Sequence, residues 1–457
     1  MMAASSTVDR SPIRKVVVAS MVGTTIEWYD FFVFGSAAAL VFNELFFPEF
    51  DPLVGVILAF ATYAVGFVAR PLGGLVFGHF GDRIGRKRML VASLLIMGAG
   101  TFAIGLLPGY GAIGVWAPIL LVVCRLLQGF AVGGEWGGAV LMVAEHGDSR
   151  RRGFWSSWPQ AGVPAGNLLA VGALALMSGV TTDAAFVSWG WRVPFLASAA
   201  LVVVGLWIRL SLSESPVFQQ ARAEIERTRQ PAPVLRVVRR YRREVLVAMG
   251  ARVAENISYY VFTVFVLTYV TKYLGLGQDL ALTAVLIASA IQLIMIPLFG
   301  ALSDRVGRRP VYLSGAAGLV FWAFGFFLLL DTKSTAGILL AVTVGLICHA
   351  AMYGPQAAFF AELFGTGVRY TGASVGYQLA SVFAGSLAPI ISLALLTTFG
   401  SALPVSLYLV LAATLTLIAV LVATETKNRD LTADTGIADE PARGSTLVPE
   451  MQGRGKE

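Results

Sequence analysis

The feature that most limits how this chain can fold is a series of apolar runs, each about 20 residues long and separated by short polar stretches. At a rise of 1.5 Å per residue, a helix of about 20 apolar residues crosses the hydrocarbon core of a bilayer. Only 13% of the 457 residues are charged, which is too few to cover a soluble protein of this size. The sequence therefore predicts a multi-pass membrane protein and excludes a disordered, collagen-like or disulfide-rich secreted chain.

Twelve apolar runs are long enough to span a membrane as helices. Their ranges are 16–42, 54–77, 89–107, 116–144, 156–180, 192–212, 245–273, 282–302, 311–330, 337–363, 373–399 and 403–423. The first run is too long for the core of a cleaved signal peptide and contains two acids, so we expect it to be kept as a helix. The two cysteines, Cys124 and Cys348, are expected to pack as small buried side chains.

Lysine and arginine residues are distributed unevenly between the loops. The N-terminal segment, the loops after the even-numbered runs and the C-terminal segment carry most of them, whereas the alternate loops hold Lys272 and Lys333, with Arg192 at a helix edge. By the positive-inside rule we expect a cytoplasmic-membrane protein with both termini in the cytoplasm. This bias also accounts for the net charge of +7, so we do not expect nucleic-acid binding.

The two halves of the chain carry related loop sequences. FGHFGDRIGRK at 77–87 recurs as FGALSDRVGRR at 299–309, an offset of 304 − 82 = 222. A second pair, Ala-Glu at 144–145 and at 361–362, has an offset of 362 − 145 = 217. Parallel repeats are typical of transporters whose site lies between the halves near the membrane midplane. The sequence therefore predicts an all-α membrane protein of twelve transmembrane helices, in two six-helix bundles related by pseudo-symmetry.

This repeat divides the chain into five segments. They are a cytoplasmic N-terminal segment (1–15), an N-terminal six-helix bundle (16–212), a cytoplasmic central loop (213–244), a C-terminal six-helix bundle (245–424) and a disordered cytoplasmic tail (425–457). The tail is predicted to be disordered because it is rich in acids, Gly, Pro and Ser and poor in large apolar residues.

The repeated loops also predict a gate. Their glycines allow neighbouring helices to approach closely, and their aspartates can bind a helix N-terminus or an arginine in one conformation and release it in another. The residues expected to take part are Gly78, Asp82, Arg83, Arg86, Glu145, Asp304, Arg305, Arg308 and Glu362. The alternative is that these arginines only set the topology, but topology requires neither a fixed aspartate nor two glycines.

Four acids lie inside the predicted spans, where an ionised group costs roughly 2.5–3.5 kcal/mol and needs a partner or a function. They are Glu27, Asp30, Glu135 and Glu255, and we expect them to couple transport to protons. Glu27 and Asp30 are about one helical turn apart and repel each other when both are charged, which favours proton binding by one of them. The alternative is static ion pairing between helices, which fits Glu135 as well as proton coupling does.

Arginines and uncharged polar residues in the spans form the expected substrate site. They are Arg70, Arg125, Gln128, Arg252, Tyr259, His349 and Gln378. An arginine that is not needed to neutralise an acid can hold an anion through two hydrogen bonds. Four of these residues also have an alternative. Arg70 could form a static ion pair, His349 could be a neutral buried side chain or a proton relay, and Tyr259 and Gln378 could make packing or helix–helix contacts.

The sequence lacks the motifs of an enzyme or of an ATP-driven pump. It has no zinc-ligand spacing, no Gly-rich phosphate loop ending in Gly-Lys-Ser/Thr and no supported Ser–His–Asp order. We therefore expect no enzymatic activity, no metal and no cofactor, and a carrier driven by the proton gradient.

Several motifs make the chain similar to the metabolite–proton symporter family of the major facilitator superfamily. They are EWYDF at 27–31, RPLGG at 70–74, QGFAVGGEWGG at 128–138, WGWRVPF at 189–195, ESPVF at 214–218 and RYTG at 369–372. The resemblance runs from about residue 16 to residue 425 and is greatest to the shikimate permeases. It implies the major facilitator fold, proton-coupled uptake of a metabolite, and transport roles for Asp30, Arg70, Arg125 and Glu135.

We expect a monomeric, proton-coupled importer of a small organic acid, such as shikimate or a di- or tricarboxylate, that works by alternating access in the lipid bilayer. A porter of zwitterions such as proline or betaine is the first alternative, although the tail lacks the sustained heptads of osmosensing members. A drug effluxer is less expected, because its usual Gly-Pro signature is only loosely matched by GVPAG at 162–166. A sensor that binds without transporting would have a similar sequence.

Overall fold

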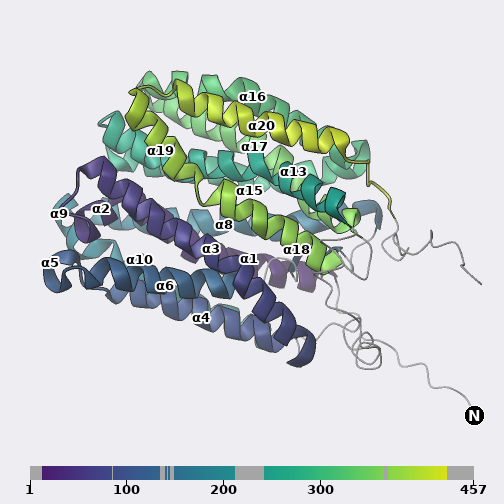
Figure 1. Ribbon diagram of the computed structural model, residues 1–457, viewed down its shortest axis with the longest axis horizontal. Helices are drawn as coiled ribbons and strands as arrows, with labels where there is room; N and C mark the ends of the chain where they lie inside the picture. Colours follow the sequence, from purple (N-terminus) through teal and green to yellow (C-terminus); the bar gives the residue numbers. More distant parts are fainter. Residues whose placement is uncertain are drawn as a thin grey trace, which may run out of the picture.

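The computed structural model describes residues 13–84, 86–133, 139–141, 143–144, 149–211, 241–364 and 369–429. All regular elements in these ranges are helical, and the long helices run side by side along the long axis of the molecule (Figure 1). The first half of the chain, α1 to α10, lies in the lower part of this view, and the second half, α13 to α20, lies in the upper part. The predicted all-helical membrane fold is confirmed.

The described elements follow the chain in this order: α1 (Ile13–Leu40), α2 (Phe42–Phe46), α3 (Pro52–Ile84), α4 (Arg86–Leu106), α5 (Tyr110–Ile113), α6 (Trp116–Val132), η1 (Ser149–Arg151), α8 (Arg152–Val180), α9 (Asp183–Ala185), η2 (Phe186–Gly190), α10 (Arg192–Ser211), α13 (Arg242–Tyr260), η3 (Val261–Phe265), α14 (Val266–Thr268), η4 (Tyr269–Tyr273), α15 (Gln278–Val306), α16 (Arg308–Asp331), α17 (Thr335–Leu363), α18 (Arg369–Ala380), η5 (Ser381–Gly385), α19 (Ala388–Phe399) and α20 (Leu403–Val422).

Each of the twelve predicted spans overlaps one of these helices or a run of consecutive ones. Within the described ranges, nine helical spans are long and apolar enough to cross a membrane singly, and the pair 183–190 and 192–208, bent by 44°, makes a tenth. The third and fourth predicted spans contain shorter apolar helices, Val91–Leu106 and Trp116–Val132. The fourth span continues through residues 134–138, which lie outside the described residues.

The two halves meet along α8 and α15, which pack antiparallel to each other. Three hydrogen bonds follow this seam from one end to the other, between Ser178 and Asp279 at 2.7 Å, Asn167 and Ser289 at 2.9 Å, and Gly153 and Asp304 at 2.8 Å. Near one end the backbones are close enough that a Cβ atom on Gly300 would lie 2.6 Å from the Ser157 hydroxyl oxygen and 2.7 Å from the Gly153 carbonyl oxygen. Glycine is required there because any larger side chain would push the two bundles apart.

Two spans of the second half change their helical pitch along their length. After Tyr260 the α13 helix continues through the π-helical turn η3, and after Ala380 the α18 helix continues through the π-helical turn η5. Single π-helical turns inside helices frequently mark functional sites. Here they adjoin Tyr259, Tyr260 and Ser381, which all lie in the interior of the molecule.

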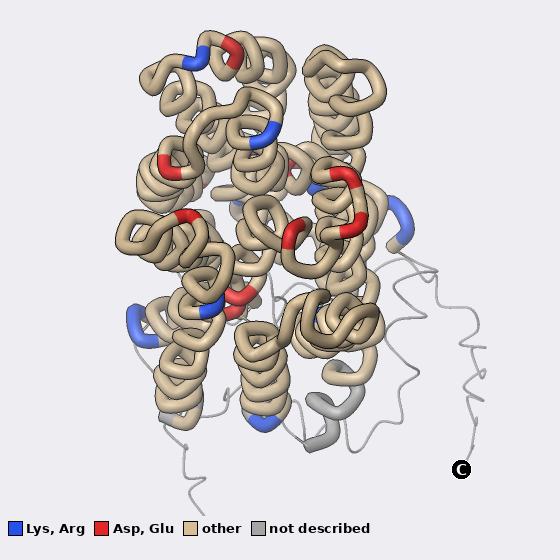
Figure 2. The backbone as a smooth tube through the Cα atoms, turned by 90° about the vertical axis from the view of Figure 1, so that its left-hand side faces the viewer, with Lys and Arg blue, Asp and Glu red and all other residues tan. Residues whose placement is uncertain are grey.

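Charged residues are concentrated at the ends of the molecule. Seen from the end that carries α2, α5 and α9, acidic and basic residues lie on the turns that face the viewer, whereas the helical tubes are largely uncharged (Figure 2). This is the distribution expected when the middle of the molecule is surrounded by hydrocarbon. The buried charges in the interior are therefore exceptions that need an explanation.

Candidate functional site

The first group of buried charges lies in the N-terminal half, around Arg125 on α6. Its guanidinium donates to Gln128 Oε1 at 2.8 Å and to the carbonyl oxygen of Tyr63 at 3.4 Å. Gln128 in turn donates to the hydroxyl of Thr101 at 2.6 Å. Within the described ranges the hydrogen-bond acceptors of Arg125 are neutral, and its Nε has no partner at all. The charge of this guanidinium, which is fully buried, is thus available to an anion.

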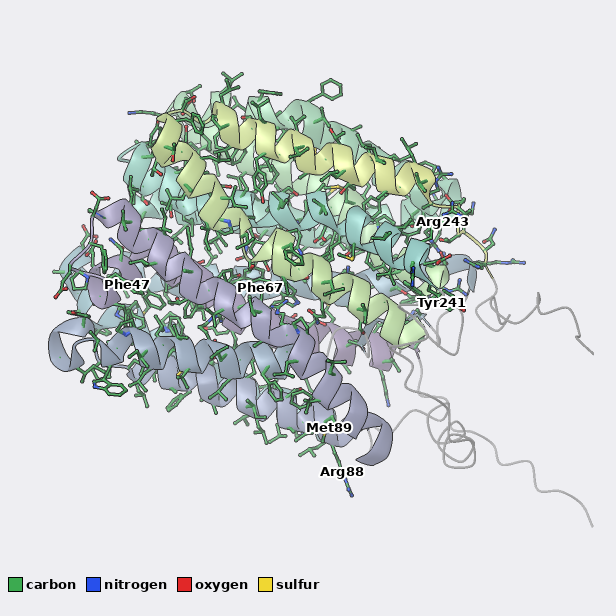
Figure 3. All side chains as sticks on the ribbon, in the orientation of Figure 1. Phe47, Phe67, Arg88, Met89, Tyr241 and Arg243 are labelled. Carbon is green, nitrogen blue, oxygen red and sulfur yellow. The ribbon has the colours of Figure 1, made fainter. Side chains whose placement is uncertain are left out.

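Arg70 on α3 lies close to Arg125, and both pack on the same aromatic ring. The Arg70 and Arg125 Cζ atoms lie 4.1 and 4.4 Å from the centroid of Phe31. Phe67, labelled midway along the molecule in Figure 3, contacts Arg70 at 4.3 Å, and Phe34 contacts Arg125 at 4.1 Å. Such cation–π contacts stabilise a desolvated guanidinium without neutralising it.

Asp30 on α1 completes this group. Its side chain is buried, and among the described residues neither carboxylate oxygen has a hydrogen-bond partner. The neighbouring Thr101 hydroxyl donates to the carbonyl oxygen of Met97 at 3.2 Å, and Arg125 and Glu27 act on Asp30 electrostatically. A buried carboxylate without partners is costly when charged and much less so when protonated. Asp30 is therefore well suited to take up a proton.

The second group lies in the C-terminal half, around Glu255 on α13. One oxygen of this carboxylate lies 2.9 Å from Arg252 Nη1 and 3.2 Å from Gln356 Nε2, and the other lies 3.2 Å from His349 Nε2. Arg252 also donates to Ser381 at 3.1 Å and lies over the ring of Tyr377. Both Glu255 and Arg252 are buried, and their charges compensate each other.

His349 on α17 connects this ion pair to α15. Its Nδ1 lies 2.7 Å from Gln292 Nε2, and its ring is 4.7 Å from that of Tyr259. Because the Gln292 amide donates to Nδ1, the ring proton resides on Nε2, which donates to Glu255. Gln292 is not among the predicted substrate residues, because its histidine partner lies 57 positions further along the chain.

Aromatic side chains link the two groups across the boundary between the halves. Phe32 of α1 lies 5.5 Å from Tyr259, and Phe67 of α3 lies 5.7 Å from Tyr260. Gln378 of α18 crosses the same boundary by donating to the Gly133 carbonyl oxygen at 3.2 Å. The structure thus brings most of the predicted substrate residues to one region between the halves. Glu135, predicted to lie there, is outside the described residues.

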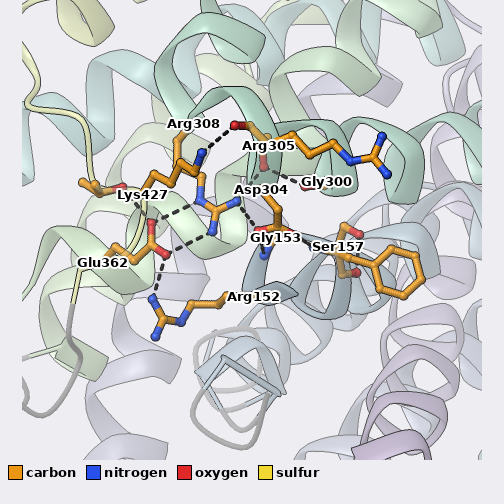
Figure 4. Close-up of polar contacts among 12 residues, drawn as sticks. Arg152, Gly153, Ser157, Gly300, Asp304, Arg305, Arg308, Glu362 and Lys427 are labelled. Carbon is orange, nitrogen blue, oxygen red and sulfur yellow. Dashed lines mark hydrogen bonds and ion pairs between the residues drawn. The ribbon is translucent and has the colours of Figure 1, made fainter. Parts of the chain in front are cut away.

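A third group of charges, which we call the charged end, joins the halves at one end of α8 and α15 (Figure 4). Asp304 accepts hydrogen bonds from the backbone N–H groups of Gly153 and Phe154, both at 2.8 Å, at the N-terminus of α8. Arg152 lies 2.9 Å from Glu362, and Arg308 pairs with both Asp304 and Glu362 at 2.7 and 3.2 Å. The contacts of Asp304 with α8 and of Arg152 with Glu362 hold the two halves together at this end, and Arg308 joins Asp304 to Glu362 within the second half.

The other predicted gating residues take different positions. Arg305 is exposed, and only its carbonyl oxygen joins the group, as an acceptor for Lys427 (Figure 4). Gly78, Asp82 and Arg83 fall within α3 and Arg86 within α4, but their side chains lie outside the described residues, as does all of Glu145.

The residues that follow α20 also belong to the charged end. Glu425 accepts from the backbone N–H groups of Arg308 and Arg309 at 2.9 and 3.0 Å, and the Thr426 hydroxyl donates to Glu362 at 2.7 Å. Burial raises the pKa of Glu425, but its backbone hydrogen bonds outweigh burial and hold the pKa below its usual value. The sequence carried no signal for these contacts, and the predicted tail thus begins with residues that bind the charged end.

At the opposite end of the seam the contacts between halves are fewer and less charged. Ser178 joins Asp279 and Gln278, and Lys272 lies 3.3 Å from Glu44 in a partly exposed ion pair. Exposed pairs of this kind contribute little. The two halves are therefore in contact at both ends of the seam, but the charged end is held by more and better-buried interactions.

Known proteins with similar sequences span nearly the whole chain. The shikimate transporter of Escherichia coli strain K12 is 43% identical over 405 residues, covering 88% of this chain and 92% of its own. An inner membrane metabolite transport protein of the same strain is 42% identical and covers 94% of this chain and 100% of its own. The proline/betaine transporter of that strain is 34% identical, with 97% and 90% covered.

Solved structures share the fold of this chain. A structure of a proton:xylose symporter with a bound bromodeoxyglucose matches with a TM-score of 0.73 at 18% identity, covering 92% of this chain and 98% of its own. The model of the Major Facilitator Superfamily matches residues 20–389. The arrangement of the helices in two halves with a long seam between them is consistent with this family. The chain belongs to the Major Facilitator Superfamily and is a multi-pass membrane transporter rather than an enzyme.

Proposed function

We propose that this protein is a proton-coupled symporter that takes up a small organic acid by alternating access. The observation that carries the proposal is the pair formed by Asp30 and Arg125, a buried carboxylate without hydrogen bonds and a buried guanidinium with neutral acceptors, among the described residues. An anion bound by Arg125 and a proton bound by Asp30 would satisfy both groups together. The relatives named as shikimate and metabolite transporters support the same substrate class.

The coupling follows from the cost of moving charge through a low-dielectric interior. Without substrate, a protonated Asp30 leaves the Arg125 charge uncompensated. When the anion is also bound, the net charge of the site falls, and the carrier is easier to reorient. Substrate and proton then move together, and the carrier returns empty.

Alternating access requires that each end of the α8–α15 seam opens in turn. We propose that the charged end faces the cytoplasm, because the loops rich in lysine and arginine lie on that side of the predicted topology. The contacts at each end can form or break as the halves move, since they join residues of different halves. Transport by a monomer suffices for this cycle, because both halves are supplied by one chain.

The relative named as a proline/betaine transporter supports a zwitterion as the second candidate. A quaternary ammonium group needs open aromatic faces. In this structure guanidinium groups already contact Phe31, Phe34 and Tyr377. This arrangement favours an organic acid.

Uptake into proteoliposomes tests the proposal. Purified protein would be reconstituted, and uptake of labelled shikimate, α-ketoglutarate, citrate and betaine measured with and without an inward pH gradient. We expect one of the organic acids to accumulate only when the outside is more acidic, and protein-free liposomes provide the background. Uptake that is indifferent to the pH gradient would refute proton coupling, and accumulation of betaine alone would favour the second candidate.

A further inference from the structure

The site between the halves carries available charge on one side only. On the N-terminal side, the described hydrogen-bond acceptors of Arg125 are neutral. On the C-terminal side, Arg252 lies 2.9 Å from Glu255 and also donates to Gln356 at 3.1 Å. An anionic group on the C-terminal side would therefore meet a carboxylate and a guanidinium that is already neutralised. When Asp30 is protonated, Arg70 and Arg125 outnumber Glu27 on the N-terminal side, which is then the cationic pole, and the C-terminal side is a pole without net charge.

The neutral pole nevertheless has polar atoms without protein partners. The Tyr259 hydroxyl and Gln292 Oε1 have no hydrogen-bond partner among the described residues, although their side chains are 3% and 0% exposed. Both residues contact the same imidazole, that of His349. If the oxygen and nitrogen of the Gln292 amide changed places, Nε2 rather than Oε1 would be the atom without a partner. Buried polar groups of this kind need a partner, and a ligand hydroxyl would both donate to and accept from them.

The two poles are joined through aromatic contacts. Arg70 lies 5.6 Å from the Trp28 ring, Trp28 stacks on Phe32 at 5.3 Å, and Phe32 lies 5.5 Å from Tyr259. Gln292 lies one turn along α15 from Ser289, which bonds to Asn167 of α8, so it too faces the boundary between the halves. A ligand that contacts both poles would therefore lie against these aromatic rings.

We propose that the site selects a monocarboxylate whose opposite end carries hydroxyl groups, and that Gln292 and Tyr259 are the residues that recognise those hydroxyls. This inference rests on the proposed function for the carboxylate at Arg125, and it narrows the substrate class. A di- or tricarboxylate is disfavoured because its second charge would lie beside Glu255. An analogue without hydroxyls is disfavoured because it leaves the Gln292 and Tyr259 polar atoms buried and unpaired.

Equilibrium binding to the purified protein in detergent tests this selection without any ion gradient. The probes are shikimate, which has a ring carboxylate and hydroxyls, 1-cyclohexene-1-carboxylate, which has the same ring and carboxylate without hydroxyls, and α-ketoglutarate. We expect shikimate to bind at least about tenfold more tightly than either other probe, the effect of one or more hydrogen bonds. In Gln292→Leu the preference for shikimate over the cyclohexene acid should fall about tenfold, through weaker shikimate binding.

Two further variants make the result specific. Tyr259→Phe keeps the ring contacts and removes only the hydroxyl, and it should reduce the same preference even if Gln292→Leu fails to fold. Gln278→Leu, on the same helix but bonded to Ser178 at the opposite end of the seam, should keep the preference of the natural protein.

Equal binding of the three probes, tighter binding of α-ketoglutarate, or an unchanged preference in both site variants would overturn the inference. The binding experiment can show this selectivity even if uptake proves not to depend on protons, and uptake can prove proton-coupled even if binding is not selective. The two proposals therefore have separate outcomes.

Discussion

Asp30 and Glu255 are both buried carboxylates on the first long helix of their half of the chain, yet their surroundings differ. Glu255 is bound by Arg252, His349 and Gln356, whereas Asp30 has no hydrogen bond among the described residues. The paired acids of the C-terminal half extend to the charged end, where Asp304 and Glu362 each have several donors. This contrast indicates that acids with partners hold helices and halves together, and that Asp30 is the carboxylate suited to proton exchange.

Removing the charge of Asp30 is the most direct test of this contrast. Asp30→Asn should reduce pH-driven accumulation of substrate to the level of protein-free liposomes, because the variant lacks the carboxyl group to which we assign proton binding and release. Counterflow exchange should remain, since exchange needs substrate binding but no net proton movement. Uptake and exchange in proteoliposomes measure both. Accumulation against a gradient in this variant would assign coupling to another residue.

Removing the corresponding charge of Glu255 should instead affect stability. Glu255→Gln leaves the Arg252 charge buried without its carboxylate, which should lower the free energy of unfolding by about 3–5 kcal/mol. Thermal unfolding of the protein in detergent measures the loss. Adding Arg252→Met to Glu255→Gln should restore much of the stability, because both charges are then gone. Asp30→Asn is the matched control and should cost little. A larger loss in Asp30→Asn than in Glu255→Gln would reverse the contrast.

A smaller effect is expected when a contact is weakened at one end of the α8–α15 seam or at the other. Asp304→Asn should weaken the contact with the N-terminus of α8 by about 1–2 kcal/mol and open the charged end. Thiol labelling of Ala361→Cys, a buried position that packs against Leu141 and Ala144, should then rise roughly 5–30-fold.

Asp279→Asn on the same helix weakens the opposite end, so it should lower the labelling of Ala361→Cys or leave it unchanged. Equal increases in the Asp304 and Asp279 variants would show that neither contact acts on one end alone.

The smallest effect is expected at Glu425, which is exposed and paired mainly with backbone N–H groups. Because the pKa of Glu425 is held below its usual value of 4.5, its stabilisation is present above about that pH and is lost as the pH falls through the lower folded value. Glu425→Gln should cost about 0.5 kcal/mol at pH 7 and almost nothing at pH 3. Thermal unfolding at both pH values checks this.

Parts of the site that depend on one helix were predictable from the sequence. Arg252 and Glu255 are three residues apart on α13, so helical geometry alone places this pair together. Asp304 and Arg308 are four apart in the chain but lie on α15 and α16, on either side of the turn at Gly307. Arg152 and Glu362 are 210 positions apart, and the repeat connected their loops without indicating that they form a pair across the halves. Gln292 and Thr426 gave no usable signal because their partners come from other helices.

The number and length of the spans, the division into halves and the presence of buried charges were determined by the sequence, because bilayer thickness and the cost of burying charge act on each segment separately. Only the tertiary structure decided which of those charges are neutralised. Neutralisation depends largely on contacts of a few ångströms between residues that are distant in the chain. His349 and Gln356 of α17 reach Glu255, whereas no described residue forms a hydrogen bond with Asp30.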